Sequence, residues 1–429
     1  MLFLIQEENW MEIVTKKSIA RNYLFLAIMV TGIILGCIVG AVWPGATVLA
    51  PLGTVFINLM FCIVVPLVFA SISSAVANVA SRQRVGKILA TTLVTFVVTG
   101  IVASVIMIVL MKIFPPILAP WPNVPPGKVD TQTTIATLIV NFFTVSDFAG
   151  LLTRRAMLPL IVFSILFGFG VSLSGGKESI VGKFLEGLTE AMLKVVQIVT
   201  YYAPVAFFGF FASLVADYGP QLIGDYGRAM AVYYPLCFIY LFTAFPFLAW
   251  FGGGKGAAKV MFKHLIRPAV TSLGTCSSVA TIPTNMAVAK ETGISKDVSD
   301  MVLPLGATMH MDGSCFAAVL KIAFLFGIFG IPFAGVGLMV KVVLVSVFAA
   351  VAMSGIPGGG YIGEFIVCTI FFPDNMAIAY PIAITIGNLV DPPATMINSS
   401  GDYVVSFIVS RYVDGKDWLQ KIIAKGAAA

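Results

Sequence analysis

The sequence predicts an all-α protein that crosses a membrane several times, and three observations indicate this fold class. Of its 429 residues, 59% are hydrophobic and 11% are charged, whereas soluble domains carry about 25% charged residues. Apolar stretches of about 20 residues, the length that crosses a bilayer as a helix, recur along the chain. Two further apolar stretches are interrupted at their centres by Gly, Ser and Pro, which is typical of segments that enter a membrane and return.

The uninterrupted stretches predict eight membrane-spanning helices, six before residue 255 and two after it. The prolines of 115–126 exclude a helix at that point and predict a loop. The broken stretches are 268–289, interrupted around Gly274 to Pro283, and 334–372, interrupted at Ser354 to Tyr361. The eight helices are expected at 22–43, 48–78, 88–113, 156–174, 191–215, 229–251, 299–329 and 377–411.

Basic residues predict the orientation. They gather in alternate loops, near 16–21, 82–87, 177–194 and 255–267, and cytoplasmic loops are the ones that collect Lys and Arg. The N-terminal segment 1–21 and the tail 412–429 are therefore expected on the cytoplasmic side of a cell membrane. No cleavable targeting segment is expected, because no basic region precedes a short apolar run. Basic residues flank both ends of the first broken stretch, so both ends are expected on the cytoplasmic side. The second broken stretch should then begin and end outside.

Composition also excludes several kinds of site. The six cysteines are scattered through apolar segments without a CxxC pair, which indicates buried thiols rather than a disulfide framework. The two histidines lie far apart in the sequence, so no zinc motif exists. We therefore expect no resident cofactor and no nucleic-acid partner.

Four polar residues form a stripe near the C-terminus. Asp391, Thr395, Asn398 and Asp402 are offset by 4, 7 and 11 positions, which places them within about 60° of arc on a helix. Ionisable groups at bilayer depth are costly unless they face a protein interior or a wet cavity. The stripe therefore predicts a binding site for a solute that crosses. The two prolines after Asp391 predict a kink or an opening of the helix there.

A second polar motif lies midway along the predicted helix 299–329. Gly313 and nearby hydroxyls predict local unwinding, which frees carbonyl groups to bind a cation beside Asp312. The alternative for Asp312 is an interhelical hydrogen bond. His310 has three open roles: a hydrogen-bonded core residue, a part of the cation site, or a proton carrier. Lys321 and Glu364 are further intramembrane charges to which the sequence assigns no functional role, and Lys321 is left either to snorkel or to pair with a carboxylate.

The first broken stretch has a hydroxyl-rich tip. Two interpretations stay open for it. Backbone N–H groups and hydroxyls at a helix start can bind an anion, or small residues there let two half-helices pack closely. The residues concerned are Ser272, Thr275, Ser277, Ser278 and Thr281.

Together these segments resemble the dicarboxylate/amino acid:cation symporter family. That family has a serine-rich first hairpin tip, the sequence N-M-D-G-T, a second tip of the G-V-P-G type, and a final helix with D-x-x-R-T-x-x-N-x-x-G-D. The counterparts here are Ser277 and Ser278, His310 to Ser314, Gly355 to Gly359, and Asp391 to Asp402. The resemblance covers nearly the whole chain and is strongest from 265 to 411.

The resemblance implies a homotrimer in which a scaffold, 22–78 with 115–222, holds a transport domain that moves like an elevator. The transport domain would comprise 79–114 and 223–411, and the protein would be a secondary transporter rather than an enzyme. Substrate would contact Ser277, Ser278, Ser314, Gly355, Pro357, Gly358, Asp391, Ala394, Thr395 and Asn398. Sodium would contact Gly306, Thr308, His310, Asp312, Asn398 and Asp402.

Departures from the family pattern refine the expected substrate. Ala394 stands where the family has the arginine that holds an acidic side chain, and Cys276 at the first tip supplies no replacement. Neutral members of the family also lack this arginine and keep the aspartate, so a small neutral amino acid is expected. A buried acidic side chain without a charged partner would be costly. Symport of an acidic amino acid or a dicarboxylate is the alternative.

The coupling ion is the second open point. His310 replaces the family asparagine, and the tyrosine of a third cation site is missing near 92–93. Sodium is expected, with protons as the alternative. A channel whose carboxylates line a pore is less favoured, because paired broken hairpins are typical of carriers. An intramembrane enzyme that uses Asp312 and Asp391 is disfavoured, because no nucleophile or metal set accompanies them.

Overall fold

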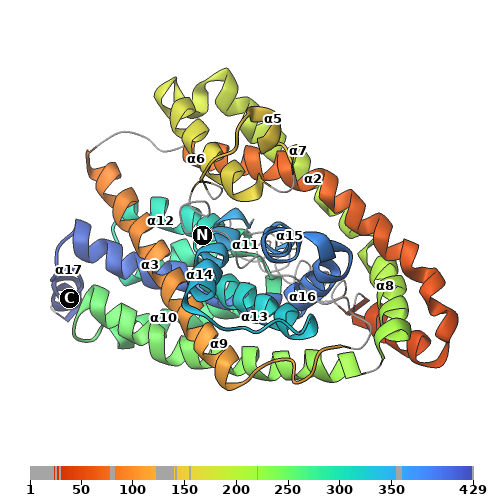
Figure 1. The fold of residues 1–429 in the computed structure, drawn as a ribbon. Coiled ribbons are helices and arrows are strands. Elements are labelled where there is room, and N and C mark those ends of the chain that lie inside the picture. Colours follow the sequence, from red (N-terminus) through yellow and green to blue (C-terminus); the bar gives the residue numbers. More distant parts are fainter. Residues whose placement is uncertain are drawn as a thin grey trace, which may run out of the picture.

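The computed structural model describes residues 24, 27, 28, 30–77, 83–121, 140, 143–153, 156–219, 221–353 and 360–427. Every regular element in these ranges is a helix (Figure 1), which confirms the all-α prediction. The elements are η1 (Pro44–Leu49), α2 (Ala50–Ala77), α3 (Gln83–Ile113), α5 (Phe148–Leu151), α6 (Met157–Leu173), η3 (Gly176–Glu178), α7 (Ile180–Thr200), α8 (Ala203–Tyr218), α9 (Gln221–Gly253), α10 (Ala257–Thr275), α11 (Ser278–Thr292), α12 (Lys296–Met309), α13 (Asp312–Ile328), α14 (Val336–Ala352), α15 (Tyr361–Phe371), η4 (Pro373–Asn375), α16 (Met376–Val413) and α17 (Trp418–Ala427).

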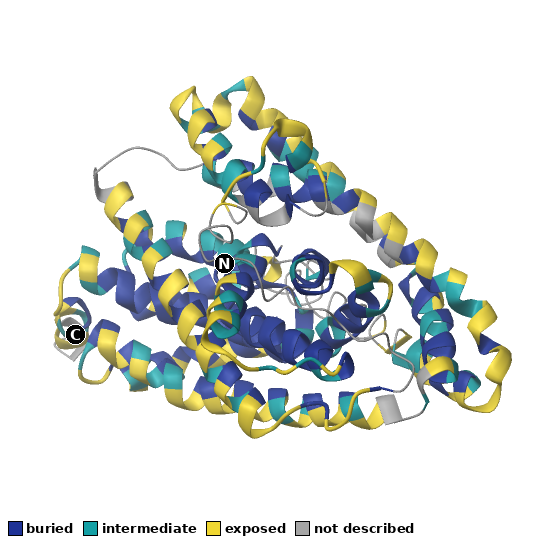
Figure 2. Ribbon diagram, viewed as in Figure 1, coloured by how far each residue is buried: buried dark blue, intermediate teal, exposed yellow. Residues whose placement is uncertain are grey.

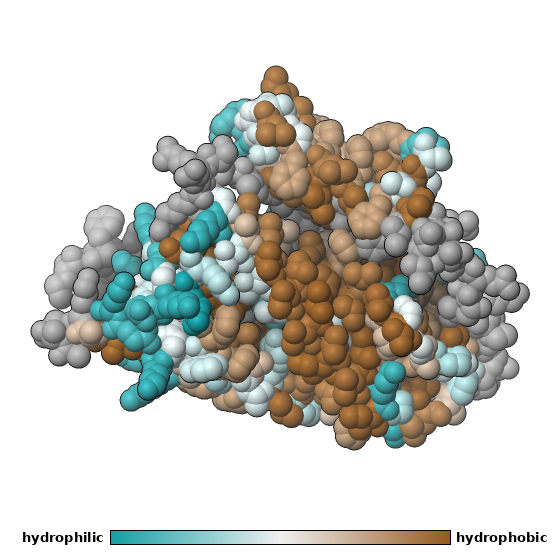
Figure 3. Space-filling model, turned by 60° about the vertical axis from the view of Figure 1, so that its left-hand side comes forward, coloured by the Kyte–Doolittle hydropathy of each residue, from teal (hydrophilic) through white to brown (hydrophobic). Residues whose placement is uncertain are grey.

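The outer surface is that of a protein embedded in lipid. Within the described ranges, three helices are long and apolar enough to cross a bilayer: Gly86–Ile113, Ile223–Gly253 and Lys296–Ile328. The pair formed by α15 with Pro373–Val413, bent by 119°, passes the same test together. Figure 3 shows hydrophobic side chains that cover the middle of one face, with hydrophilic ones to one side of them. The count of eight spans stays a prediction.

Two groups of helices pack within themselves. α2 contacts α6, α7 and α8, whereas α16 contacts α3, α9, α10, α12 and α13. In Figure 1 the first group runs along the top and right and the second fills the centre and left. The burial colouring shows α13 and the second half of α16 as the most enclosed elements (Figure 2). The polar stripe predicted on the last helix therefore lies in the centre of the protein, away from lipid.

The two sequence breaks lie where they were predicted. The first falls between α10 and α11, where Cys276 has a positive φ of 49° and Ser277 is extended. The second separates α14 from α15, and its tip, 354–359, lies outside the described residues. The predicted substrate contacts Gly355, Pro357 and Gly358 are therefore also outside them.

One predicted helix is wrong. The apolar stretch 191–215 is not a single helix, because α7 ends at Thr200 and α8 begins at Ala203. Pro204 explains the break, since a proline ring inside a continuous helix would clash with the carbonyl of Thr200 four residues earlier. Proline is well placed at the start of a new helix, where its missing N–H costs nothing.

The double proline of the last helix behaves differently. α16 continues as one helix through Pro392 and Pro393, so no opened turn lies beside Asp391. Pro393 has no N–H to donate to the carbonyl of Leu389. The hydroxyl of Tyr234, on α9, donates to that carbonyl at 2.7 Å instead. A partner from a neighbouring helix thus satisfies one of the two carbonyls that the prolines free, which is how prolines are tolerated within membrane helices.

Candidate substrate and cation site

The site is built around a break in the middle of the protein. α12 ends at Met309 and α13 begins at Asp312, with His310 and Met311 in non-helical conformations between them. This confirms the predicted unwinding. Asn398 of α16 holds the start of α13, because its Oδ1 accepts hydrogen bonds from the backbone N–H of Gly313 at 2.8 Å and of Ser314 at 3.3 Å.

Glycine is required at the start of α13. A Cβ on Gly313 would lie 2.8 Å from the Cα of Ala394, so only a glycine lets the two backbones approach this closely. The amide of Asn398 also donates to the Ser314 hydroxyl at 3.0 Å. In this structure both polar ends of Asn398 therefore position the break, and its role in binding substrate or sodium stays a prediction.

His310 lies between two buried carboxylates. Its Nδ1 is 3.0 Å from Oδ1 of Asp402, and its Nε2 is 3.5 Å from Oδ1 of Asp312. The Thr99 hydroxyl is 3.0 Å from the same Nε2, and the ring stacks on Phe96 with centroids 4.6 Å apart. His310 and Asp312 are 1% exposed and Asp402 is fully buried. The predicted cation site thus contains an imidazole placed to bridge its two acids.

Two oxygens of this cluster accept no hydrogen bond from the described residues: Oδ1 of Asp312, which lies 3.5 Å from Nε2 of His310, and Oδ2 of Asp402. Tyr240 donates to the other Asp312 oxygen at 3.0 Å. Buried carboxylate oxygens without partners are costly, and oxygen ligands are what hard cations prefer. The two acids therefore fit a cation site, as do the carbonyls freed by the α12–α13 break.

The other predicted sodium ligands lie on α12. The carbonyl of Gly306 accepts the N–H of His310 at 2.9 Å, and the Thr308 hydroxyl donates to the Leu305 carbonyl at 3.0 Å. A carbonyl oxygen and a hydroxyl oxygen can each accept further contacts, so both residues keep the capacity to bind a cation.

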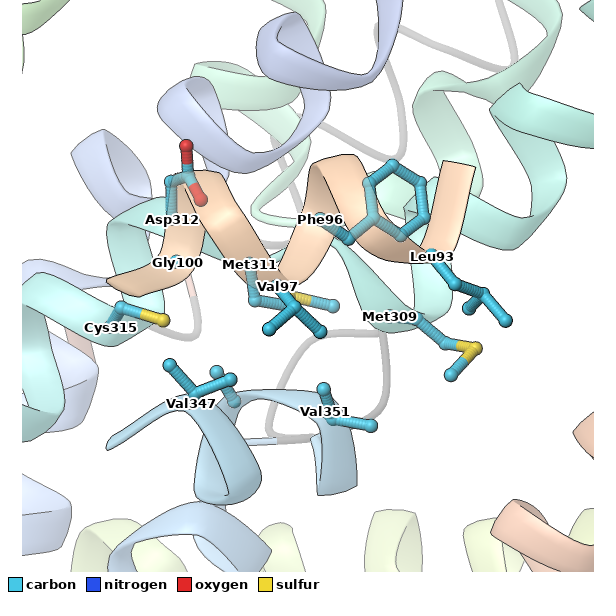
Figure 4. Close-up of a pocket in the computed structure, with 11 residues that line it drawn as sticks. Leu93, Phe96, Val97, Gly100, Met309, Met311, Asp312, Cys315, Val347 and Val351 are labelled. Atoms are coloured by element: carbon cyan, nitrogen blue, oxygen red, sulfur yellow. The ribbon is translucent and has the colours of Figure 1, made fainter. Parts of the chain in front are cut away.

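An apolar cavity of about 40 Å³ adjoins the cluster on the side of α3 (Figure 4). Val347 and Val351 of α14 reach toward α3 across it, and Leu93 and Phe96 come from α3 itself. Asp312 is the one charged residue of its described lining. The absence of a tyrosine near 92–93 therefore leaves this wall without an oxygen ligand from an aromatic side chain.

A second cavity of about 40 Å³ brings predicted substrate residues together. Ser314, Asp391 and Ala394 all line it. The hydroxyl of Thr395 donates to Oδ1 of Asp391 at 3.0 Å and so fixes that carboxylate. The cavity is smaller than an amino acid, so in this conformation it accounts for only part of a substrate.

The same cavity contains residues to which the sequence assigned no role. Lys321 and Glu364 line it and form a buried ion pair. Spacing could have placed Lys321 there, because it follows Ser314 by seven positions and so lies on the same face of α13. No such pattern connects Glu364, on α15, with the cavity-lining residues of α13 or α16.

The hydroxyls of the first broken tip serve mainly the backbone around them. Ser277 caps α11, since its Oγ accepts the N–H of Ala280 at 3.2 Å, and Thr281 donates to the Ser277 carbonyl at 2.9 Å. Asn285 ties α11 to α16 by a 2.8 Å bond to the Ser399 carbonyl. Ser277 and Ser278 are buried but do not line the second cavity. Their contact with substrate stays a prediction.

Comparisons with known proteins agree with this architecture. The model of the "Sodium:dicarboxylate symporter family" matches residues 25–412. The chain is 26% identical to the "Proton/sodium-glutamate symport protein" of Geobacillus stearothermophilus over 400 residues, which cover 89% of this chain and 92% of that protein. It is 25% identical to the "C4-dicarboxylate transport protein" of Rhizobium leguminosarum over 418 residues, 94% of this chain and 92% of that protein. The chain therefore belongs to the sodium:dicarboxylate symporter family.

Proposed function

We propose that this symporter carries a small neutral amino acid together with a cation. The observation that carries the proposal is the charge of the second cavity. Its described lining has two carboxylates, Asp391 and Glu364, and a single cation, Lys321, which is already paired with Glu364. Asp391 can therefore receive a substrate ammonium, but an acidic side chain would bring a third negative charge without a free partner. An acidic amino acid or a dicarboxylate, the cargo in the names of the relatives, is the alternative.

The proposal includes an elevator-type homotrimer in the cell membrane, with both termini in the cytoplasm. The packing of the helices mainly within two groups supports a scaffold and a moving domain. In particular, α3 packs on α12, α13, α14 and α16, although it lies between scaffold segments in the sequence.

Sodium is the proposed coupling ion. Three observations support it: Oδ2 of Asp402 has no partner among the described residues, the Asp312 carboxylate lies in the same cluster, and the family description names sodium. The bridging position of His310 is the feature that favours the alternative, protons.

Transport by purified protein in proteoliposomes tests both parts of the proposal. With an inward sodium gradient, uptake of labelled alanine or serine is expected to exceed uptake of aspartate or succinate. Replacing sodium with choline at fixed pH should reduce uptake to background. Saturable counterflow should appear, because a carrier exchanges labelled for unlabelled substrate and a pore does not. Uptake of succinate that exceeds uptake of alanine and serine would overturn the proposal of a neutral substrate. Uptake that does not change when sodium is replaced would overturn the proposal of sodium coupling.

Gly306→Ala tests the cation cluster separately. A Cβ at this position would lie 2.6 Å from the Cγ of Asp402 and would displace its carboxylate. Overpacking of this kind costs about 1–3 kcal/mol of folding free energy, so we expect a lower melting temperature and loss of the stabilisation by sodium. Gly337→Ala on α14 is the matched control, because a Cβ there meets nothing within 4 Å. Sodium stabilisation that survives in Gly306→Ala would place the cation elsewhere.

A further inference from the structure

The Lys321–Glu364 ion pair forms one wall of the second cavity. Both residues are 2% exposed. The pair lies directly against the backbone of α16, since a Cβ on Gly387 would be 3.3 Å from Nζ of Lys321 and 3.1 Å from Cδ of Glu364. Gly360 makes room for the same carboxylate, with its ideal Cβ 3.4 Å from Oε2. Three elements, α13, α15 and α16, thus enclose the pair in one position.

The pairing decides which charges this wall can offer. A buried charge is tolerated when an opposite charge and hydrogen bonds compensate it. Lys321 already compensates Glu364, so its ammonium is not free for a substrate carboxylate. The wall as a whole is neutral, although it contains two ionisable groups.

The wall nevertheless has unused hydrogen-bonding capacity. Oε2 of Glu364 is buried and has no hydrogen-bond partner among the described residues, and the same holds for Nδ2 of Asn388. Both residues line the cavity together with Asp391 and Ala394. A carboxylate oxygen can only accept, whereas an amide nitrogen can only donate. Besides the N–H groups of Lys321, one of which is used in the ion pair, the wall therefore offers an acceptor at Glu364 and a donor at Asn388.

The distance along α16 matches a short substrate. Gly387, beneath the ion pair, precedes Asp391 by four residues, which is about 6 Å along the helix axis. A substrate whose ammonium binds Asp391 can therefore place the end of a short side chain at Glu364. The cavity of about 40 Å³ leaves room for only a small group there.

We propose that the Lys321–Glu364 pair is a specificity determinant that selects neutral amino acids with a hydrogen-bond donor at the end of a short side chain. Oε2 of Glu364 accepts from a carboxamide or a hydroxyl of the substrate, and Asn388 donates to a carboxamide oxygen. This inference rests on the proposed function, because it assumes an amino acid bound at Asp391.

Three amino acids of nearly the same shape test the proposal without any variant. Asparagine, leucine and aspartate differ mainly in the distal group, which is respectively a donor with an acceptor, apolar, and anionic. In sodium-driven proteoliposomes, asparagine should inhibit uptake of labelled alanine at least about tenfold more strongly than leucine, because leucine leaves the polar wall unpaired. Aspartate should be the weakest inhibitor. Threonine should likewise inhibit alanine uptake more strongly than valine does.

Variants of the pair give a second, independent readout. Glu364→Gln leaves Lys321 without an anion, so inhibition by aspartate should strengthen at least about tenfold relative to inhibition by asparagine. Lys321→Met should weaken inhibition by aspartate further. The double variant should show neither the gain of Glu364→Gln nor the loss of Lys321→Met. Glu190→Gln, an exposed glutamate of α7, is the matched control and should leave the profile unchanged. The double variant carries no unpaired charge, so it tests the wall even if either single variant does not fold.

The outcomes separate this inference from the function on which it rests. Equal inhibition by asparagine and leucine would overturn the inference and leave a neutral amino acid symporter. An active Glu364→Gln protein in which asparagine and aspartate inhibit alanine uptake in the same ratio as in the unmodified protein would also overturn the inference. Absence of amino acid uptake by the unmodified protein would overturn the proposed function itself. A preference for aspartate that Lys321→Met abolishes would overturn both, because Lys321 would then bind the substrate carboxylate.

Discussion

Asp391→Asn is expected to reduce amino acid uptake at least about 100-fold, the loss typical when one partner of a buried charge pair is removed. The carboxylate lines the cavity, and Thr395 already occupies its Oδ1 at 3.0 Å. Its second oxygen is therefore the one that can receive a substrate ammonium. Asparagine keeps the shape and can still accept the Thr395 hydrogen bond, but it has no charge. Initial rates of sodium-driven uptake measure the loss.

Two controls make the result specific. The melting temperature of Asp391→Asn should stay near that of the unmodified protein, because the substitution preserves the local hydrogen bond. Asp300→Asn, at an exposed position of α12, should transport normally. If Asp391→Asn retains uptake of the amino acid, or if an amine-free dicarboxylate is carried equally well before and after the substitution, Asp391 does not bind an ammonium.

The sequence predicted the parts of the site that depend on neighbours along the chain. Gly313 and the adjacent polar residues indicated the break that separates α12 from α13. The spacing of the final polar stripe placed its four residues on one helix face. Thr395, Asn398 and Asp402 are buried, and Asp391 is half-buried and lines the second cavity. These features depend on local backbone preferences and helical periodicity, and both can be read from a single segment.

Other features depend on partners far away in the sequence and could not be predicted. Lys321 and Glu364 are 43 residues apart; the sequence leaves Lys321 either to snorkel or to pair with a carboxylate, and it does not identify Glu364 as the partner. The helix does not open at the double proline, and Tyr234, 155 residues before Leu389, satisfies one of the two carbonyls that the prolines free. For His310 the sequence left three roles open, and only the tertiary arrangement places its ring between Asp312 and Asp402.

These long-range contacts also change the meaning of Ala394. In the sequence, Ala394 stands where the family has an arginine, and the absence of that arginine indicates a neutral substrate. In the structure, Ala394 lines a cavity whose lining includes the Lys321 ammonium, but Glu364 neutralises that ammonium. Under the proposed function, selectivity depends on two features together: the small side chain at 394 and the pairing of Lys321.

Ala394→Arg is expected to convert the site to one that accepts acidic substrates. The guanidinium would add a positive charge to a lining that has two carboxylates and one ammonium, and arginine binds carboxylates in a bidentate manner that lysine cannot reproduce. Aspartate uptake should rise at least about tenfold relative to asparagine uptake, which corresponds to about 1.4 kcal/mol of differential binding. Ala394→Gln, of similar length but uncharged, separates charge from the loss of space. If aspartate uptake in the arginine variant does not exceed that in the glutamine variant, the residue at position 394 does not face the substrate side chain.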